Sequence, residues 1–236
     1  MKKQKVLIIG NKQYSNFKLD NILDTFDIIY RFNLAWPDHN NGTKFGKLAM
    51  CGHIYHNFAA TNPSKEQIME KYSGEYNPAY LSEWYDFFES NKNKFEKIFH
   101  LNEHQWGEWN RILSEYGCPY TFPTMATTGY SAIFTNLRDS DNEIFVSNFT
   151  FYKDEIKRSM GVSDQCVDAD NRGDGCHSFS DETKILNWLH KNKKIDASLC
   201  MLDDAEEISI NTNNGNTEPS EFILDLLRRE RHERNR

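Results

Sequence analysis

The segment Val6 to Asn11, sequence VLIIGN, constrains the fold more than any other part of the chain. Its apolar run passes directly into Gly10 and Asn11, which is typical of a buried central strand that ends in a tight turn. In an open α/β sheet, ligands bind beyond the carboxyl ends of such strands. Gly10 lets the backbone approach a ligand closely, and Asn11 offers both a donor and an acceptor. The turn lacks the G-x-G-x-x-G pattern, which argues against a dinucleotide-dependent dehydrogenase.

Further apolar runs alternate with segments of helical spacing along the chain. The strands that we expect after the first lie at residues 26–33, 47–51, 97–100, 143–147 and 195–202. The helices that we expect lie at residues 17–23 and 106–116 and begin near residues 63, 78, 123–132 and 180. Ser180 is the expected N-cap of the last of these helices. This order predicts an α/β protein with a single Rossmann-like, mostly parallel sheet flanked by helices.

Composition and charge narrow the class of protein. The chain has 236 residues, which fits one domain or one domain with a small lid. Its net charge of −7 argues against broad nucleic-acid binding. It contains no long apolar run and no apolar leader, so we expect a cytoplasmic protein. Its cysteines follow no C-x-x-C pattern, which favours reduced thiols and leaves a bridge between Cys166 and Cys176 as an open alternative.

The second half of the chain carries the more polar segments. Thr127, Thr128 and Gly129 open an expected helix, where hydroxyls and amides can face an anion. Residues 153–176 are charged and lack periodicity, which predicts a lid loop. We therefore divide the chain into a catalytic domain at 1–210 and a linker with an amphipathic helix at 211–236. Docking of that helix on the core is expected, with pairing between subunits or peripheral contact with the inner membrane as alternatives.

Taken in order, these segments resemble the motifs of sialyltransferases of the bacterial family 42 and the eukaryotic-type family 29. The matching residues are Gly10 and Asn11, the run 26–33 with Arg31 and Asn33, then Gly42 and Lys44, Thr127 to Gly129, the run 144–152, and His177 and Ser178 followed by Glu182. This chain departs from the families' patterns after Asn11 and at Thr150, where an aspartate is usual.

The resemblance implies an inverting, metal-independent transfer of an acidic sugar, usually sialic acid, from a CMP-activated donor to a glycan hydroxyl. It also implies a variant A-type glycosyltransferase fold that needs no cofactor besides the CMP-sugar donor. His177 would be the general base, because a histidine titrates near neutral pH, and Tyr152 would contact the leaving phosphate. The remaining matched residues would bind the donor: Gly10, Asn11, Arg31, Asn33, Thr127, Thr128, Gly129, Ser178 and Glu182.

Other interpretations stay open at this point. A related CMP-sugar such as CMP-Kdo is one alternative, and a non-catalytic module that binds a nucleotide or glycan is another. Asp168 and Asp170 form an Asp-x-Asp, the pattern with which many UDP- and GDP-sugar transferases hold a metal. The histidine pairs 53/56 and 100/104 lack an obvious third metal ligand, and structural roles are expected for them. The acceptor, the linkage and the oligomeric state do not follow from the sequence.

Overall fold

A computed structural model describes residues 3–10, 19–32, 37, 42–51, 55–72, 78–139, 141–149, 178–201 and 220–234. Several predicted features lie outside these residues. They are the lid loop at 153–176, the domain division at 210, the Asp-x-Asp of Asp168 and Asp170, and the candidate site residues Asn11, Asn33, Tyr152 and His177. The predictions for these residues therefore remain predictions.

The described strands form one parallel sheet with the order β4-β3-β2-β1-β5. Their bounds are Gln4–Ile9 for β1, Ile28–Phe32 for β2, Lys47–Cys51 for β3, Lys97–Leu101 for β4 and Asn142–Ser147 for β5. The predicted central strand is β1, which pairs with β2 on one side and with β5 on the other. The α/β fold class with a Rossmann-like parallel sheet is confirmed.

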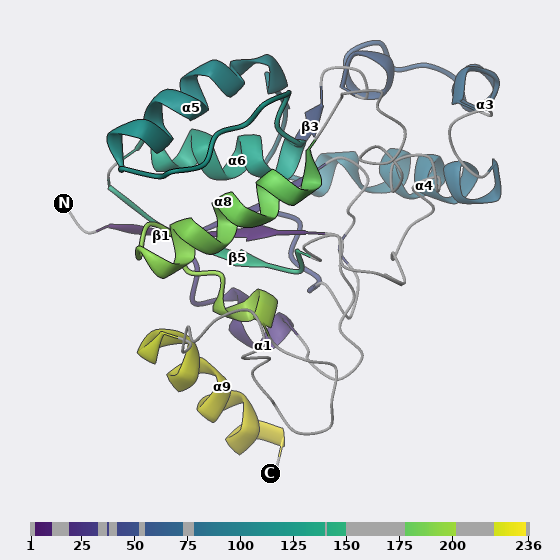
Figure 1. Cartoon of the computed structure of the whole chain (residues 1–236). Coiled ribbons are helices and arrows are strands. Elements are labelled where there is room, and N and C mark those ends of the chain that lie inside the picture. The colour runs from purple at the N-terminus through teal and green to yellow at the C-terminus, as the bar shows by residue number, and fades with distance from the viewer. Residues whose placement is uncertain are drawn as a thin grey trace.

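Helices cover both faces of the sheet. The α-helices are α1 (Asp20–Leu23), α3 (Lys65–Tyr72), α4 (Pro78–Asn91), α5 (Trp106–Glu115), α6 (Thr128–Leu137), α8 (Phe179–Lys191) and α9 (Glu221–Arg234). Shorter helical turns are η1 (Tyr55–Ala59), η2 (Lys92–Lys94), η3 (Glu103–Gln105) and η5 (Ser198–Met201). Figure 1 shows α5, α6 and α8 on one face of the sheet and α1 and α9 on the opposite face. None of the helices in the described part is long and apolar enough to cross a membrane.

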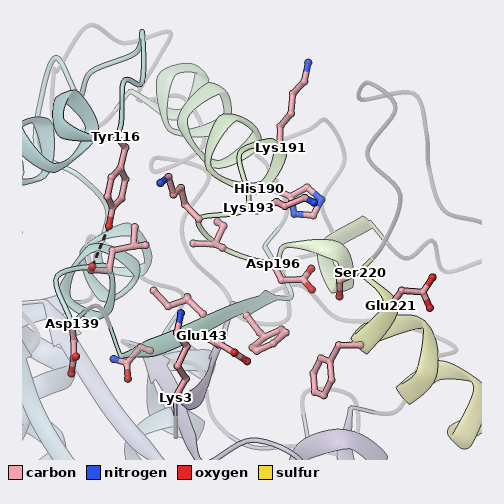
Figure 2. A pocket seen from close by; sticks show the side chains of 17 residues that line it. Lys3, Tyr116, Asp139, Glu143, His190, Lys191, Lys193, Asp196, Ser220 and Glu221 are labelled. Carbon is pink, nitrogen blue, oxygen red and sulfur yellow. Dashed lines mark hydrogen bonds between the residues drawn. The ribbon is translucent and has the colours of Figure 1, made fainter. Parts of the chain in front are cut away.

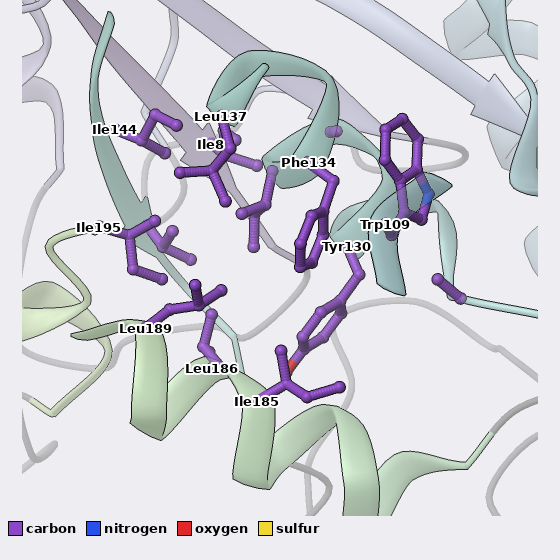
Figure 3. Close-up of a cluster of buried hydrophobic side chains, with 14 of the residues drawn as sticks. Ile8, Trp109, Tyr130, Phe134, Leu137, Ile144, Ile185, Leu186, Leu189 and Ile195 are labelled. Atoms are coloured by element: carbon purple, nitrogen blue, oxygen red, sulfur yellow. The ribbon is translucent and has the colours of Figure 1, made fainter. Parts of the chain in front are cut away.

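The core follows from the alternation of side chains along β1. Val6 and Ile8 pack against α5, α6 and α8, whereas Leu7 and Ile9 pack against α1 and α9. Figure 3 shows the first of these clusters, in which Ile185, Leu186 and Leu189 of α8 lie against the apolar residues of α6 and β5. A strand that is buried on both faces must be apolar throughout, and this explains the unbroken apolar run in the sequence.

The C-terminal helix α9 packs on the core, as expected. Ile223 and Leu226 are buried in the same cluster as Leu7 and Ile9 of β1. Phe222 extends the contact through edge-to-face packing with Phe26. The helix is therefore part of the folded unit in the described structure.

Two local predictions are wrong. Of the strand predicted at residues 195–202, the described residues 195–201 form none: only Asp196 pairs with β5, and the helical turn η5 follows. The carboxylate of Asp196 accepts hydrogen bonds from the amide and the hydroxyl of Ser198, and this turns the chain away from the sheet. The N-cap of α8 is Ser178 rather than Ser180, which lies inside the helix.

Candidate functional site

The strand order reverses between β1 and β5, and this reversal identifies one place at the edge of the sheet. From β1 the chain continues to β2, β3 and β4 on one side, and β5 returns to the other side of β1. Ligands of open α/β sheets bind at such switch points, beyond the carboxyl ends of the strands. Gly10 follows β1 at this edge, and its amide donates to the carbonyl of Ser147 at the end of β5, at 2.7 Å.

A glycine is required at residue 10 because the backbone after β5 lies against it. A Cβ atom on Gly10 would lie 2.3 Å from the carbonyl oxygen of Asn148 and 2.9 Å from the ring of Phe149. Such a contact cannot form without displacing one of the two strand ends. The partner in this close approach is the chain itself, and the predicted approach of Gly10 to a ligand remains a prediction.

Asn148 is a residue of this edge that the sequence analysis did not single out. It is buried and adopts the left-handed conformation, with φ of 60°, directly after β5. The hydroxyl of Ser147 donates to its side-chain oxygen. The signal was present in the sequence, because Asn148 follows a buried strand just as Asn11 and Asn33 follow theirs.

Two motifs that lie 55 residues apart meet at this edge. The carboxylate of Glu182 accepts hydrogen bonds from the amide of Thr127 at 2.6 Å and from its hydroxyl at 3.1 Å. The hydroxyl of Tyr130 donates to the backbone carbonyl of Glu182 at 2.7 Å. Thr127 is the N-cap of α6, so the carboxylate lies where the helix dipole favours negative charge. Glu182 is only 1% exposed, and these contacts fix the first turn of α8 to the start of α6.

The start of α6 in turn lies over the ends of two strands. A Cβ on Gly129 would lie 3.0 Å from the rings of Phe149, after β5, and of Phe32, at the end of β2. Thr128, beside it, is buried. The structure thus brings Gly10, Thr127, Thr128, Gly129 and Glu182 to one edge of the sheet.

Ser178, the N-cap of α8, is half-buried. Its hydroxyl donates to the carboxylate of Asp181 at 2.7 Å, and Lys184 donates to the same carboxylate at 2.9 Å. The hydrogen bond from Ser178, followed by that from Lys184, lowers the pKa of Asp181 below its ordinary value. The first turn of α8 therefore carries a stably ionised carboxylate at its positive end.

Arg31 is fully buried and lies one residue before the end of β2. Its guanidinium donates to the carbonyl of Lys44 at 2.9 Å and to the carbonyl of Gly42 at 2.6 Å. These bonds hold the segment before β3 against β2. They connect three residues of the first sequence motif, Arg31, Gly42 and Lys44, in the folded chain. The predicted contact of Arg31 with the donor is a separate matter and remains a prediction.

Histidines from the two predicted pairs approach each other at another part of the sheet. The rings of His56 in η1 and His100 in β4 have centroids 5.3 Å apart, and Tyr55 stacks on His100 at 6.0 Å. Desolvation, followed by the charges of His56 and His104, lowers the pKa of His100. Within the described ranges, no group of three or more His, Cys, Asp or Glu side chains has the geometry of a metal site.

No protein-family model and no curated protein matches the sequence. The chain is similar to solved sialyltransferases. For the monofunctional α-2,3-sialyltransferase Cst-I of Campylobacter jejuni, the match covers 92% of this chain and 83% of the other, with 17% identity and a TM-score of 0.45. For CstII of Campylobacter jejuni in complex with CMP-3FNeuAc, it covers 91% and 90%, with 17% identity and a TM-score of 0.43. These are enzymes of the class that the motifs resemble, and similarity at this level does not assign an activity to this chain.

The described edge combines two helix N-termini with two carboxylates of the chain itself, Glu182 at the start of α6 and Asp181 in the first turn of α8. The N-termini of α6 and α8 meet there, and each carries the positive end of a helix dipole. The carboxylate of Glu182 already accepts from Thr127, so the amide and hydroxyl of Thr127 serve the fold before they serve a ligand.

Proposed function

We propose that this protein is a glycosyltransferase that moves an acidic sugar, such as sialic acid, from a CMP-activated donor to a glycan hydroxyl. The observation that supports this proposal most directly is the contact between Glu182 and Thr127. It joins two of the motifs on which the resemblance to sialyltransferases rests, at the edge of the sheet where a nucleotide is expected to bind.

The roles of the remaining residues follow from their places in the sequence. Asn11 follows Gly10 and Asn33 follows Phe32 in the sequence, and the amide side chains of both residues would suit recognition of cytosine and ribose. Thr128 and Gly129 belong to the start of α6, where phosphate oxygens are favoured. Tyr152 would donate a hydrogen bond to the departing phosphate.

His177 directly precedes Ser178, the N-cap of α8. In the proposed step, His177 removes the proton of the acceptor hydroxyl as its oxygen bonds to the anomeric carbon. The bond between the anomeric carbon and the phosphate oxygen breaks, and CMP leaves with that electron pair. Attack opposite the leaving group inverts the anomeric configuration, and the step needs no metal ion.

The proposal is tested by measuring CMP release from CMP-sialic acid in the presence of a panel of glycan acceptors. We expect turnover that is insensitive to EDTA, and we expect His177→Ala to lose at least a hundredfold in rate, as removal of a general base does. His104→Ala, which removes an exposed histidine of η3, serves as the control. Full activity of His177→Ala would refute the assigned base, and CMP binding without turnover would favour a non-catalytic module.

The same assay separates the alternative donors. Turnover of CMP-Kdo in place of CMP-sialic acid would keep the mechanism and change the sugar. Activity that requires UDP- or GDP-sugars and a divalent metal would contradict the proposal and would direct attention to Asp168 and Asp170.

A further inference from the structure

The two ends of the sheet differ in what they offer a ligand. Figure 2 shows an open cavity of about 750 Å³ at the amino end of β5, beside the end of α8 and the start of α9. Lysines and carboxylic acids line it in equal number, and they favour no class of ligand. At the carboxyl ends of the strands, two aromatic side chains, Phe32 and Phe149, are only half-buried. Ligand sites are commonly lined by aromatic side chains, and this is the edge at which a ligand is expected.

The ring of Phe149 fills the space that two glycines of the sequence motifs leave open. A Cβ atom on Gly10 would lie 2.9 Å from this ring, and a Cβ atom on Gly129 would lie 3.0 Å from it. Gly10 follows β1 and Gly129 belongs to the first turn of α6, so one ring lies against both elements. A side chain at either glycine would crowd Phe149, because packed groups leave no room for an added carbon atom.

The backbone and two further rings fix the position of Phe149. Asn148, whose φ is 60°, brings its own carbonyl and the ring of Phe149 against Gly10. The ring of Phe149 lies 5.6 Å from that of Phe32 and 6.1 Å from that of Tyr130, and both are edge-to-face contacts. Among the described residues, no ring stacks parallel to Phe149. The position of Phe149 is therefore set before a ligand binds, which favours affinity.

A flat heterocycle is the part of a nucleotide that fits beside such a ring. Aromatic side chains bind nucleobases by stacking, because every base has a π-face. Phosphate and ribose are recognised through hydrogen bonds and charge instead, and a phenylalanine ring has neither to offer. The half-buried ring of Phe149 therefore selects the base rather than the sugar phosphate.

We propose that the ring of Phe149 stacks on the base of the donor nucleotide. The proposal rests on the proposed function, and it adds a binding residue that the motif assignments do not include. Phe32 borders the same surface, since its ring also lies 3.0 Å from a Cβ placed on Gly129. The two glycines and the turn at Asn148 thus hold an aromatic surface at the edge of the sheet.

Calorimetric titration with CMP and with ribose 5-phosphate, which lacks the base, tests this role. Phe149→Leu keeps an apolar side chain and removes the aromatic face. We expect it to weaken CMP binding about tenfold, as loss of one stacked base does, and to leave ribose 5-phosphate binding unchanged. Phe99→Leu is the matched control, because Phe99 is a half-buried phenylalanine of the same apolar cluster but lies on β4. It should change neither affinity.

A second measurement uses the unmodified phenylalanine and holds even if Phe149→Leu does not fold. In protein that is protonated only at phenylalanine, saturation of the ring protons should pass to H5 and H6 of bound CMP more strongly than to its ribose protons. Absence of this transfer would overturn the stacking role, and so would equal losses of CMP and ribose 5-phosphate affinity in Phe149→Leu. If the wild type binds and turns over its CMP-sugar in either case, only the role of Phe149 is refuted. If the wild type does not bind CMP, the proposed function fails and the stacking role fails with it.

Discussion

At the scale of single residues, Glu182 has the most defined role in the described site. Its buried carboxylate holds both the amide and the hydroxyl of Thr127. Glu182→Gln keeps an oxygen for the amide and an NH₂ group for the hydroxyl, so it should lower the free energy of unfolding by only about 1 kcal/mol. Glu182→Ala removes the acceptor of the part-buried Thr127 amide and a buried side chain, and it should lower the free energy of unfolding by about 3 kcal/mol. Urea denaturation measures both values, and equal effects of the two substitutions would contradict this role.

Gly10 offers a second prediction at this scale. In Gly10→Ala, the new Cβ would lie 2.3 Å from a backbone oxygen of Asn148. We expect a loss of about 3 kcal/mol, the upper end for overpacking, and a fall in Tm of roughly 6–12 °C. Gly107→Ala is the matched control, because a Cβ there meets nothing within 4 Å, and it should stabilise α5 by about 0.5 kcal/mol. A thermal melt in which both variants behave alike would rule out the close approach.

The lowered pKa of His190 predicts how the stability of the fold depends on pH. Desolvation lowers its pKa, although the charge of Asp196 acts in the opposite direction. The folded protein therefore binds this proton less readily than the unfolded chain, whose histidines titrate near pH 6.5. Stability contributed by the neutral ring should be present above about pH 6.5 and fall as the pH drops from there toward the lower folded pKa. His190→Asn should flatten the stability profile in this range, and an unchanged profile would exclude His190 as its cause.

At the scale of elements, α9 is the helix whose contribution is easiest to test. Ile223 is fully buried between α9 and the sheet. Ile223→Ala should lower the free energy of unfolding by about 2–4 kcal/mol, as cavities in a packed core do. Arg228→Ala, an exposed change on the same helix, should have an effect below about 0.5 kcal/mol. If Ile223→Ala were as mild as Arg228→Ala in denaturant titrations, α9 would not be a stable part of the core.

The elements also show what can be predicted from the sequence. The strand β1 was predictable because burial on both faces requires an unbroken apolar run, and the helices α4 and α5 were predictable from their apolar spacing. The segment 195–201 has a similar apolar character, but the hydrogen bonds between Ser198 and Asp196 lead it into the helical turn η5. Hydrogen bonds between a side chain and nearby groups can replace strand pairing, and the spacing of apolar residues in the sequence does not reveal them.

At the scale of the whole molecule, the fold could be predicted further than the site. The order of strands and helices specified a parallel sheet, and the sheet specified the edge at which a ligand is expected. The bond between Thr127 and Glu182 could not be predicted from spacing, because it joins residues from separate helices. The conformation of Asn148 was not predicted either, since only the position of β5 beside β1 explains why the chain turns there.

The central claim is that this edge of the sheet binds CMP, and a thermal-shift comparison of CMP, UDP and GDP, each with and without EDTA, tests it most directly. A nucleotide present at about 100 times its Kd adds about 2.7 kcal/mol to stability, which corresponds to a rise in Tm of about 5–10 °C for a chain of this size. We predict such a shift with CMP alone, unchanged by EDTA. A shift only with UDP or GDP and a divalent metal, or no shift with any nucleotide, would contradict the account.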